Sequence, residues 1–324
     1  MPPASLSEQQ IAHILSRALP KHALKSAEPL TGGLMNTMYR LHAEGLQEAF
    51  VLRVYSRDPS ACRKEVDLHQ LVSGRAPVPE IVYADPRADP REEDGVGPHI
   101  LMRWIEGQTF RQIKSRRDPR EMAEAAHSIG VTLAQIGSFQ FPRAGSIGPG
   151  LEVGAPLAEG PDPVPTFIES CLESPEMARR FDERHRHRLR GFIRDWAKQI
   201  ATIGEERSLV HSDYGSPNIL LDQANGRWKV AAVLDWEFAF AGSPLYDVGH
   251  ILRYDRLTPP LMQPHFAAGF REGGGALPEN WRDLARVLDL AALCDVLTRP
   301  GLPEGVVAEL VELVVATMLE SHFQ

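Results

Sequence analysis

The sequence predicts an α+β fold of two lobes, in which a small β-rich lobe precedes a larger, mainly helical lobe. The apolar runs at 49–55 and 99–107 are typical of buried strands, and both come early in the chain. Long helical patterns dominate from residue 118 onward. We therefore expect two units, residues 1–104 and residues 105–324, with one principal helix in the first.

Composition and charge indicate a globular protein and exclude several classes. The 324 residues are 43% hydrophobic and 24% charged, and the formal net charge of −8 argues against a nucleic-acid partner. Cys62, Cys171 and Cys294 are too few and too far apart to indicate a disulfide framework or a zinc site. The N-terminus does not resemble a signal peptide, and no apolar run reaches the roughly 18 residues of a membrane span. We expect a cytoplasmic protein without membrane or nucleic-acid partners.

The elements of the first lobe follow from capping residues, apolar runs and turn residues. Ser5 and Glu8 fit a capping box before a helix that continues to about residue 18. Gly32 and Gly33 fit the turn of a hairpin between two strand-like segments. The other expected elements are a strand at 49–55, a helix at 59–72, a surface loop at 85–98 and a strand with a hinge at 99–107.

The second lobe begins with clear helix signals. Asp118 followed by proline begins a predicted helix over 118–136, and Ser174 followed by proline begins one over 174–203. The Arg-rich part of the latter, 179–190, is typical of a solvated helix face and not of a nucleic-acid or metal site. The remaining elements are a loop at 141–165, a hairpin at 219–234, a helix at 248–253 and two helical runs within 281–319, broken at 299–303.

Residues 209–235 carry the most specific chemistry. His211, Asp213 and Asn218 match H-x-D-x-x-x-x-N, the catalytic-loop pattern of protein kinases, and Asp235 ends the next apolar run. In that pattern the first aspartate receives the proton of the acceptor hydroxyl, while the asparagine and the second aspartate hold Mg²⁺. Phosphoryl transfer chiefly needs an oriented hydroxyl and neutralised phosphate charge. The pattern therefore indicates a phosphotransferase.

Turn residues explain how these side chains could meet. Pro217 would turn the chain so that Asp213 and Asn218 face one cleft. Asn-Gly at 225–226 lies between two apolar runs and predicts a hairpin that returns Asp235 beside Asn218. The alternative is a chance His-Ser-Asp tripeptide, with the asparagine and the second aspartate as an ordinary turn residue and strand end.

Two longer runs carry a resemblance to a known family. These are LVHSDYGSPNILLD at 209–222 and VLDWEFAFAGSPLYDVGHI at 233–251, and the second fits D-W-x-x-A-x-x-G-x-P-x-x-D from Asp235 to Asp247. Together they resemble the aminoglycoside phosphotransferase and choline kinase family of small-molecule kinases. The resemblance implies a two-lobed, protein-kinase-like fold. It also implies Mg²⁺-dependent transfer of the γ-phosphate of ATP (or GTP) to a hydroxyl of a small-molecule acceptor.

The same resemblance implies roles for the residues of the second lobe. Asp213 would orient and deprotonate the acceptor hydroxyl, and Asn218 and Asp235 would hold the metal. Asp247 would be structural, either capping the following helix or bracing the catalytic loop.

In the first lobe, Arg53 stands where protein kinases carry the lysine of V-A-I-K. Arginine can bind phosphate bidentately but is bulkier than lysine. Glu65 on the following helix would pair with Arg53, unless it is merely a solvated helix residue. The other implied nucleotide contacts are Gly33, Asn36 and Thr37 in the first hairpin, Met102 behind the nucleotide, and the backbone of Arg103 and Ile105 at the hinge.

Several alternatives remain open at this level. A protein kinase is disfavoured because G-x-G-x-x-G and A-P-E are absent, and Trp236-Glu237 replaces the Phe-Gly of D-F-G. A non-catalytic nucleotide binder would not need Asp213. The loop at 141–165 could edge the substrate cleft or be a plain insertion.

The acceptor is also open among aminoglycosides, macrolides, choline, homoserine and sugars. Most of the acidic excess falls after Trp104, which favours a cationic acceptor such as an aminoglycoside-like aminocyclitol. The sequence does not decide between ATP and GTP, the oligomeric state or the role of Glu237.

Overall fold

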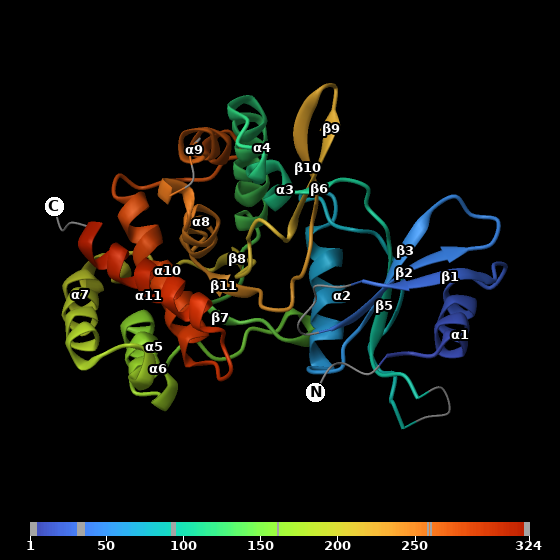
Figure 1. The fold of residues 1–324 in the computed structure, drawn as a ribbon, viewed down its shortest axis with the longest axis horizontal. Helices are drawn as coiled ribbons and strands as arrows, with labels where there is room; N and C mark the ends of the chain where they lie inside the picture. Colours follow the sequence, from blue (N-terminus) through green and yellow to red (C-terminus); the bar gives the residue numbers. More distant parts are fainter. Residues whose placement is uncertain are drawn as a thin grey trace.

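A computed structural model gives the fold and describes residues 5–320 except 31–35, 92–94, 161, 258 and 260. It confirms the α+β architecture, with a β-sheet lobe on the right of Figure 1 and a larger helical lobe on the left. The proposed boundary after residue 104 lies between β5 (His99–Arg103) and β6 (Gln108–Thr109).

The first lobe is built on a five-stranded antiparallel sheet in the order β1-β2-β3-β5-β4. The other four strands are β1 (Leu24–Pro29), β2 (Thr37–Ala43), β3 (Ala49–Val54) and β4 (Ile81–Asp85). β3 is paired on both sides and buries Phe50 and Leu52, so it forms the rigid middle of the sheet. Arg53 is carried on this central strand.

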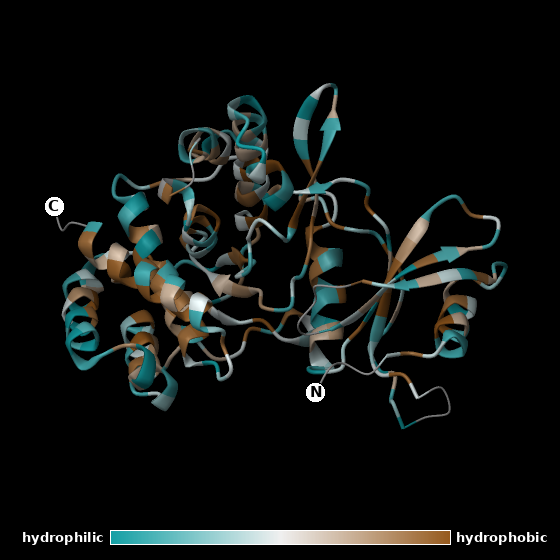
Figure 2. Ribbon diagram, in the orientation of Figure 1, coloured by the Kyte–Doolittle hydropathy of each residue, from teal (hydrophilic) through white to brown (hydrophobic). Residues whose placement is uncertain are grey.

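Helix α1 (Glu8–Ala18) covers one face of the sheet. Ile11, Ile14 and Leu15 are buried in one cluster with residues of β2 and β3, and Figure 2 shows hydrophobic residues (brown) where α1 meets the sheet. The capping box predicted at Ser5 and Glu8 is wrong. The structure forms it between Ser7 and Gln10, because the first helical turn begins later than predicted.

Helix α2 (Ser60–Val72) lies between the sheet and the second lobe (Figure 1). It contacts β4 and β5 and also the short helix η1 (Pro149–Leu151) of the second lobe. The backbone N–H of Gly150 donates a hydrogen bond of 2.7 Å to the Asp67 carboxylate of α2. Part of the predicted loop at 141–165 therefore contacts the first lobe.

The second lobe is mainly helical, as predicted. Its helices are α3 (Phe110–Ser115), α4 (Pro119–Gly137), α5 (Pro163–Leu172), α6 (Pro175–Arg180), α7 (Glu183–Ala201), α8 (Leu245–Leu252), η2 (Asp255–Leu257), α9 (Gln263–Glu272), α10 (Trp281–Thr298) and α11 (Glu304–Glu320). Its strands, besides β6, are β7 (Gly145–Ser146), β8 (Ser208–Val210), β9 (Ile219–Ala224), β10 (Arg227–Val233) and β11 (Phe240–Gly242).

The single helix predicted over 174–203 is two helices. Phe181 adopts an extended backbone and ends α6, and the Asp182 side chain accepts a hydrogen bond from the His185 N–H to begin α7. An aspartate is a preferred N-cap residue and marks the start of a new helix, but the helical apolar pattern continues across this position and did not indicate the break. Three elements at 141–165 were also missed, since β7 and η1 lie within that segment and α5 begins at Pro163.

Helices α4 and α9 pack closely because glycines face the contact. A Cβ on Gly130 would lie 2.2 Å from the Phe266 carbonyl oxygen, and one on Gly269 would lie 2.0 Å from the His127 carbonyl oxygen. The contact therefore has no room for side chains at these two positions.

The predicted hairpin at 219–234 is confirmed as β9 and β10. Asn225 and Gly226 have φ of 54° and 72°, and a two-residue hairpin turn of type I′ requires positive φ at both of its central residues. Within the described residues, no helix combines the length and hydropathy needed to cross a bilayer.

Candidate active site

The catalytic-loop pattern lies between β8 and β9, and His211 anchors it. His211 is fully buried, its Nε2 lies 3.0 Å from the Leu234 carbonyl oxygen, and its ring packs against Trp236 at 4.7 Å between centroids. The Asp213 N–H donates to Nδ1 at 3.2 Å. Burial lowers the pKa of His211 to about 3, so the ring is neutral, and its hydrogen bonds fix the position of the loop.

Asp247 braces the same loop from α8. Its carboxylate accepts the N–H groups of His211 at 2.7 Å and Ser212 at 2.8 Å. Ser212 has φ of 71°, a conformation that non-glycine residues rarely adopt, so the two bonds hold a strained backbone. Of the two structural roles predicted for Asp247, the structure contains the brace.

The structure brings Asp213 and Asn218 together. Asn218 Nδ2 donates to a carboxylate oxygen of Asp213 at 2.7 Å and to its carbonyl oxygen at 3.0 Å. Burial raises the pKa of Asp213 to about 6; the hydrogen bond from Asn218 lowers it and the nearby charge of Asp235 raises it further. Such a carboxyl group is suited to accepting a proton near neutral pH.

Asp235 lies beside this pair, as the hairpin predicts. The N–H of Leu234 donates to the Asn218 carbonyl oxygen at 2.9 Å, which fixes the end of β10 against the catalytic loop. Asp235 has φ of 67°, and its side chain is 32% exposed, so it remains accessible to a ligand. Its Oδ1 accepts from Arg53 Nη2 at 2.7 Å.

The predicted ion pair of Arg53 and Glu65 is present, with 3.2 Å between Nη1 and Oε1. Both side chains are almost fully buried. Burial alone would raise the pKa of Glu65, but the charge of Arg53, the nearby His69 and a hydrogen bond from Tyr55 lower it to about 2. The Tyr55 hydroxyl donates to Glu65 at 2.6 Å. Arg53 is therefore fixed from α2 while it also contacts Asp235 of the second lobe.

Glu237 also belongs to this cluster, and the sequence left its role open. Its Oε2 accepts from Asn36 at 2.9 Å and from Arg53 at 3.2 Å, and Lys64 donates to its carbonyl oxygen at 2.7 Å. Its Oε1 is buried without a hydrogen-bond partner among the described residues. Burial, then the charge of Asp235, raises the pKa of Glu237. In the sequence, the position of Glu237 two residues after Asp235 was the signal that could have placed it in this cluster.

The predicted residues of the first hairpin are only partly placed. Asn36 is buried and points toward Glu237, while Thr37 begins β2 and pairs with Val54. Gly33 lies outside the described residues.

The hinge residues end the first sheet. Met102 is buried on β5, with the ring of Tyr55 and the helix α2 in the same hydrophobic cluster. The Arg103 N–H donates to the Glu80 carbonyl oxygen at 2.9 Å, and its exposed side chain contacts Glu48 and Glu80. The N–H of Ile105 makes no backbone hydrogen bond to the described residues.

His250 is a neighbour of Asp213 that the sequence analysis did not predict. Its Nε2 lies 3.5 Å from Asp213 Oδ1, and its side chain is 20% exposed. Burial, then the charge of Arg253, lowers its pKa to about 4, so the ring is neutral. Only its position one turn after Asp247 could have indicated this contact.

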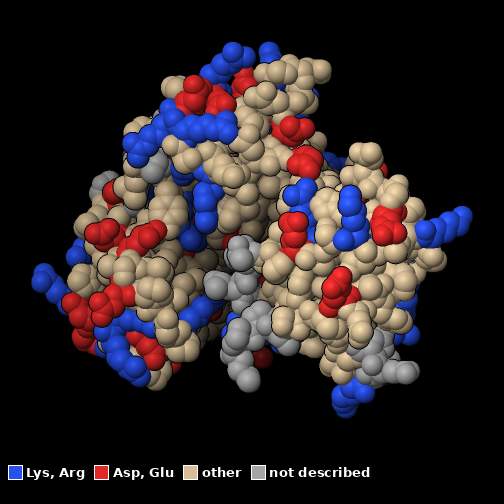
Figure 3. All heavy atoms as spheres, turned by 45° about the vertical axis from the view of Figure 1, so that its right-hand side comes forward, with Lys and Arg blue, Asp and Glu red and all other residues tan. Residues whose placement is uncertain are grey.

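Figure 3 shows that the molecular surface is hollowed between the two lobes.

The sequence matches one family model, and the fold matches solved structures. The model described as the phosphotransferase enzyme family matches residues 26–287. A thermostable mutant of aminoglycoside phosphotransferase APH(4)-Ia, in ternary complex with AMP-PNP and hygromycin B, is 19% identical with a TM-score of 0.70. The match covers 97% of this chain and 99% of that one.

Two further structures share the fold. The GDP complex of aminoglycoside 2'-phosphotransferase-IIIa is 15% identical with a TM-score of 0.65, covering 98% of this chain and 100% of that one. The streptomycin-ATP-APH(2")-IIa ternary complex is 15% identical with a TM-score of 0.62, covering 99% and 100%. At these identities the likeness concerns the fold alone.

A curated relative is acyl-CoA dehydrogenase family member 11 of Gallus gallus, 25% identical over 237 residues. The match covers 71% of this chain but only 28% of the relative, so the chain spans little more than a quarter of that protein's length.

Proposed function

The chain belongs to the phosphotransferase enzyme family and is a small-molecule kinase, and we propose that it transfers the γ-phosphoryl group of ATP (or GTP) to an acceptor hydroxyl in a Mg²⁺-dependent reaction. The observation that carries this proposal is the meeting of Asp213, Asn218 and Asp235 at one point, with Arg53 reaching the last of them. Nucleotide binding is assigned to residues 1–104, and catalysis with acceptor binding to 105–324.

The donor set fits Mg²⁺. Asn218 and Asp235 offer an amide and a carboxylate oxygen, and the cation would neutralise the phosphate charge when bound. The unpartnered Oε1 of Glu237 is a buried acceptor that a hydrated cation would satisfy. Arg53 meets three carboxylates, which leaves surplus negative charge at this point. No three His, Cys, Asp or Glu side chains form a metal cage in the described part of the chain, and Mg²⁺ bound partly by phosphates needs none.

Further residues are proposed to contact the nucleotide. Arg53, fixed by Glu65, would grip the phosphates. Asn36 lies at the metal-site cluster and would turn from Glu237 to a phosphate. The other proposed contacts are Gly33 and Thr37 on the first hairpin, Met102 behind the purine, and the backbone of Arg103 and Ile105 along its edge. The relatives' complexes contain AMP-PNP, ATP and GDP, so both purines are candidates.

Asp213 would act as the base. Its raised pKa keeps it able to take the hydroxyl proton near neutral pH, and the bond from Asn218 orients it. The acceptor classes that the family and the relatives' ligands support include aminoglycosides, since two of the solved relatives hold hygromycin B or streptomycin.

A label-transfer screen tests the proposal. Wild type and Asp213→Asn are incubated with γ-labelled ATP, Mg²⁺ and a panel of aminoglycosides, macrolides, choline, homoserine and simple sugars. We expect label on at least one organic acceptor with the wild type, reduced roughly 10²–10⁴-fold in the variant. Transfer that is equally fast in both proteins would remove Asp213 from the base role.

A further inference from the structure

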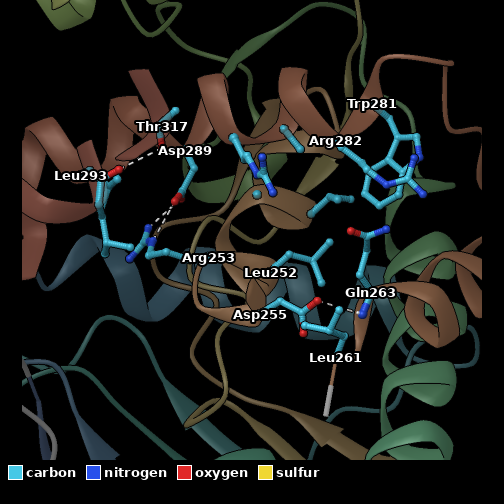
Figure 4. A pocket seen from close by; sticks show the side chains of 15 residues that line it. Leu252, Arg253, Asp255, Leu261, Gln263, Trp281, Arg282, Asp289, Leu293 and Thr317 are labelled. Carbon is cyan, nitrogen blue, oxygen red and sulfur yellow. Dashed lines mark hydrogen bonds and ion pairs between the residues drawn. The ribbon is translucent and has the colours of Figure 1, made fainter. Parts of the chain in front are cut away.

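A small cavity in the second lobe is lined by none of the residues assigned to catalysis, metal or nucleotide binding. It measures about 220 Å³ and lies between α8, α10 and α11, beside the segment that leads into α9 (Figure 4). Trp281, Leu252 and Leu293 supply part of its apolar wall, and Arg253, Arg282 and Arg286 line its polar part. Sites for drug-sized ligands typically span roughly 300–1,000 Å³. The cavity therefore suits a compact metabolite.

One lining residue of this cavity, Arg253, lies on the same helix as a neighbour of Asp213. Arg253 lines it from α8, one helical turn beyond His250, whose ring lies 3.5 Å from Asp213. The positive charge of Arg253 also acts on the Asp213 carboxylate. A molecule in the cavity could thus extend past Arg253 to present a hydroxyl to Asp213.

The two carboxylates of the cavity are already engaged. Asp289 accepts two hydrogen bonds from Arg253, each 2.7 Å, and Figure 4 shows the two side chains directed at one another. Asp255 accepts the backbone N–H groups of Met262 at 2.7 Å and Gln263 at 3.1 Å. Both carboxylates therefore already accept hydrogen bonds from the protein.

Two guanidinium groups make no hydrogen bond to a carboxylate among the described residues. Arg282 lies over the Trp281 ring at 4.8 Å and, with the Gln263 amide turned, donates only to that neutral oxygen. Arg286 approaches Asp283 no closer than 3.7 Å, and its side chain is 35% exposed. The local charge of the cavity is therefore positive, although the chain as a whole is acidic.

We propose that the acceptor is a small hydroxy acid, with its carboxylate held by Arg282 and Arg286 and its hydroxyl directed at Asp213. Guanidinium groups suit a carboxylate because they can donate two parallel hydrogen bonds. The inference rests on the proposed kinase function and narrows its acceptor class away from the cationic aminocyclitol. The hydroxyl oxygen bonds to the γ-phosphorus as the bond to the β-phosphate oxygen breaks. ADP leaves, and the hydroxyl proton passes to Asp213.

Acceptors matched in length but different in charge test the class. ADP release is measured with ω-hydroxy acids of three to eight carbons, with the corresponding diols and with the corresponding amino alcohols; Asp213→Asn serves as the blank. We expect kcat/KM to be at least tenfold higher for the best acid than for its diol, and lower still for the amino alcohol. Faster transfer to amino alcohols or diols than to any acid would overturn the inference and leave the kinase intact.

Removal of one charge identifies the subsite. Arg286→Gln should raise the KM for the best acid tenfold or more, since hydrogen bonds to charged groups are worth roughly 1.5–3 kcal/mol. The KM for ATP should not change. Arg188→Gln, which removes an exposed charge from α7, should change neither. An unchanged KM for the acid in Arg286→Gln would overturn the assignment.

A binding measurement separates this inference from the kinase proposal. If no compound gives ADP release that depends on Asp213, the kinase proposal fails, and thermal shifts with the same acids decide the cavity. Larger shifts for wild type than for Arg286→Gln would support a carboxylate subsite, and equal shifts would overturn it.

Discussion

The ionisation of Asp213 links its surroundings to activity. The carboxyl group must be ionised to accept a proton, and its pKa is raised to about 6, mainly by burial. We expect kcat/KM to be lost as pH falls through about 6 and to level off above it. A pH profile over 4.5–8 measures this, and a flat profile across that range would contradict the assignment.

The same residue should also affect stability. Because burial raises its folded-state pKa above the unfolded value, Asp213 favours the folded state most at low pH and loses this contribution as pH rises toward about 6. Asp213→Asn should therefore be no less stable than wild type at pH 7. The variant can serve as a folded blank, and thermal denaturation at pH 7 checks it.

Arg53 combines a buried ion pair with a proposed phosphate contact. Removing its charge would leave Glu65 buried and uncompensated, which costs about 3–5 kcal/mol, so Arg53→Lys is the informative change. It keeps the charge but loses the fork that spans Glu65 and Asp235. ATP affinity should fall more than adenosine affinity, whereas Arg63→Lys on the exposed side of α2 should alter neither. Equal losses for adenosine and ATP would show that Arg53 shapes the lobe.

At the scale of elements, the close approach of α4 and α9 is a sharp test of packing. Gly269→Ala would place a Cβ 2.0 Å from the His127 carbonyl oxygen, so we expect a loss of about 1–3 kcal/mol in the free energy of unfolding. Gly191→Ala on α7 is the matched control, because no atom lies within 4 Å of its added Cβ. It should stabilise the protein by up to about 1 kcal/mol. Denaturant unfolding of both variants measures the difference, and equal effects would contradict the packing account.

Elements with strong local signals were predictable from the sequence. The hairpin at 219–234 follows from Asn225-Gly226 between apolar runs, and α4 follows from Asp118 before a proline. The break between α6 and α7 was not predicted, because the apolar spacing continues through it. Only the Asp182 cap marks the restart. The strand β7 is two residues long and depends on pairing with the distant β11, which no local pattern encodes.

At the scale of the molecule, the two lobes meet through contacts between residues far apart in the chain, which local sequence patterns do not predict. Asn36 and Lys64 of the first lobe both contact Glu237, and Asp67 contacts Gly150. The motif predicted the residue types at the site and their order along the chain. The sequence predicted that Arg53 pairs with Glu65 but not that it also contacts Asp235 and Glu237, because these contacts depend on how the lobes pack. For the same reason, the net charge of the whole chain did not predict a cavity lined by arginines.

The central claim is that Asp213 serves the acceptor hydroxyl while Asp235 serves the metal. The most direct measurement is ATP affinity with and without Mg²⁺, together with turnover, on Asp213→Asn and Asp235→Ala. We expect Asp213→Asn to keep the Mg²⁺-dependent gain in ATP affinity and lose turnover, and Asp235→Ala to lose both. Wild-type Mg²⁺ dependence in Asp235→Ala, or near-normal turnover in Asp213→Asn, would contradict the account.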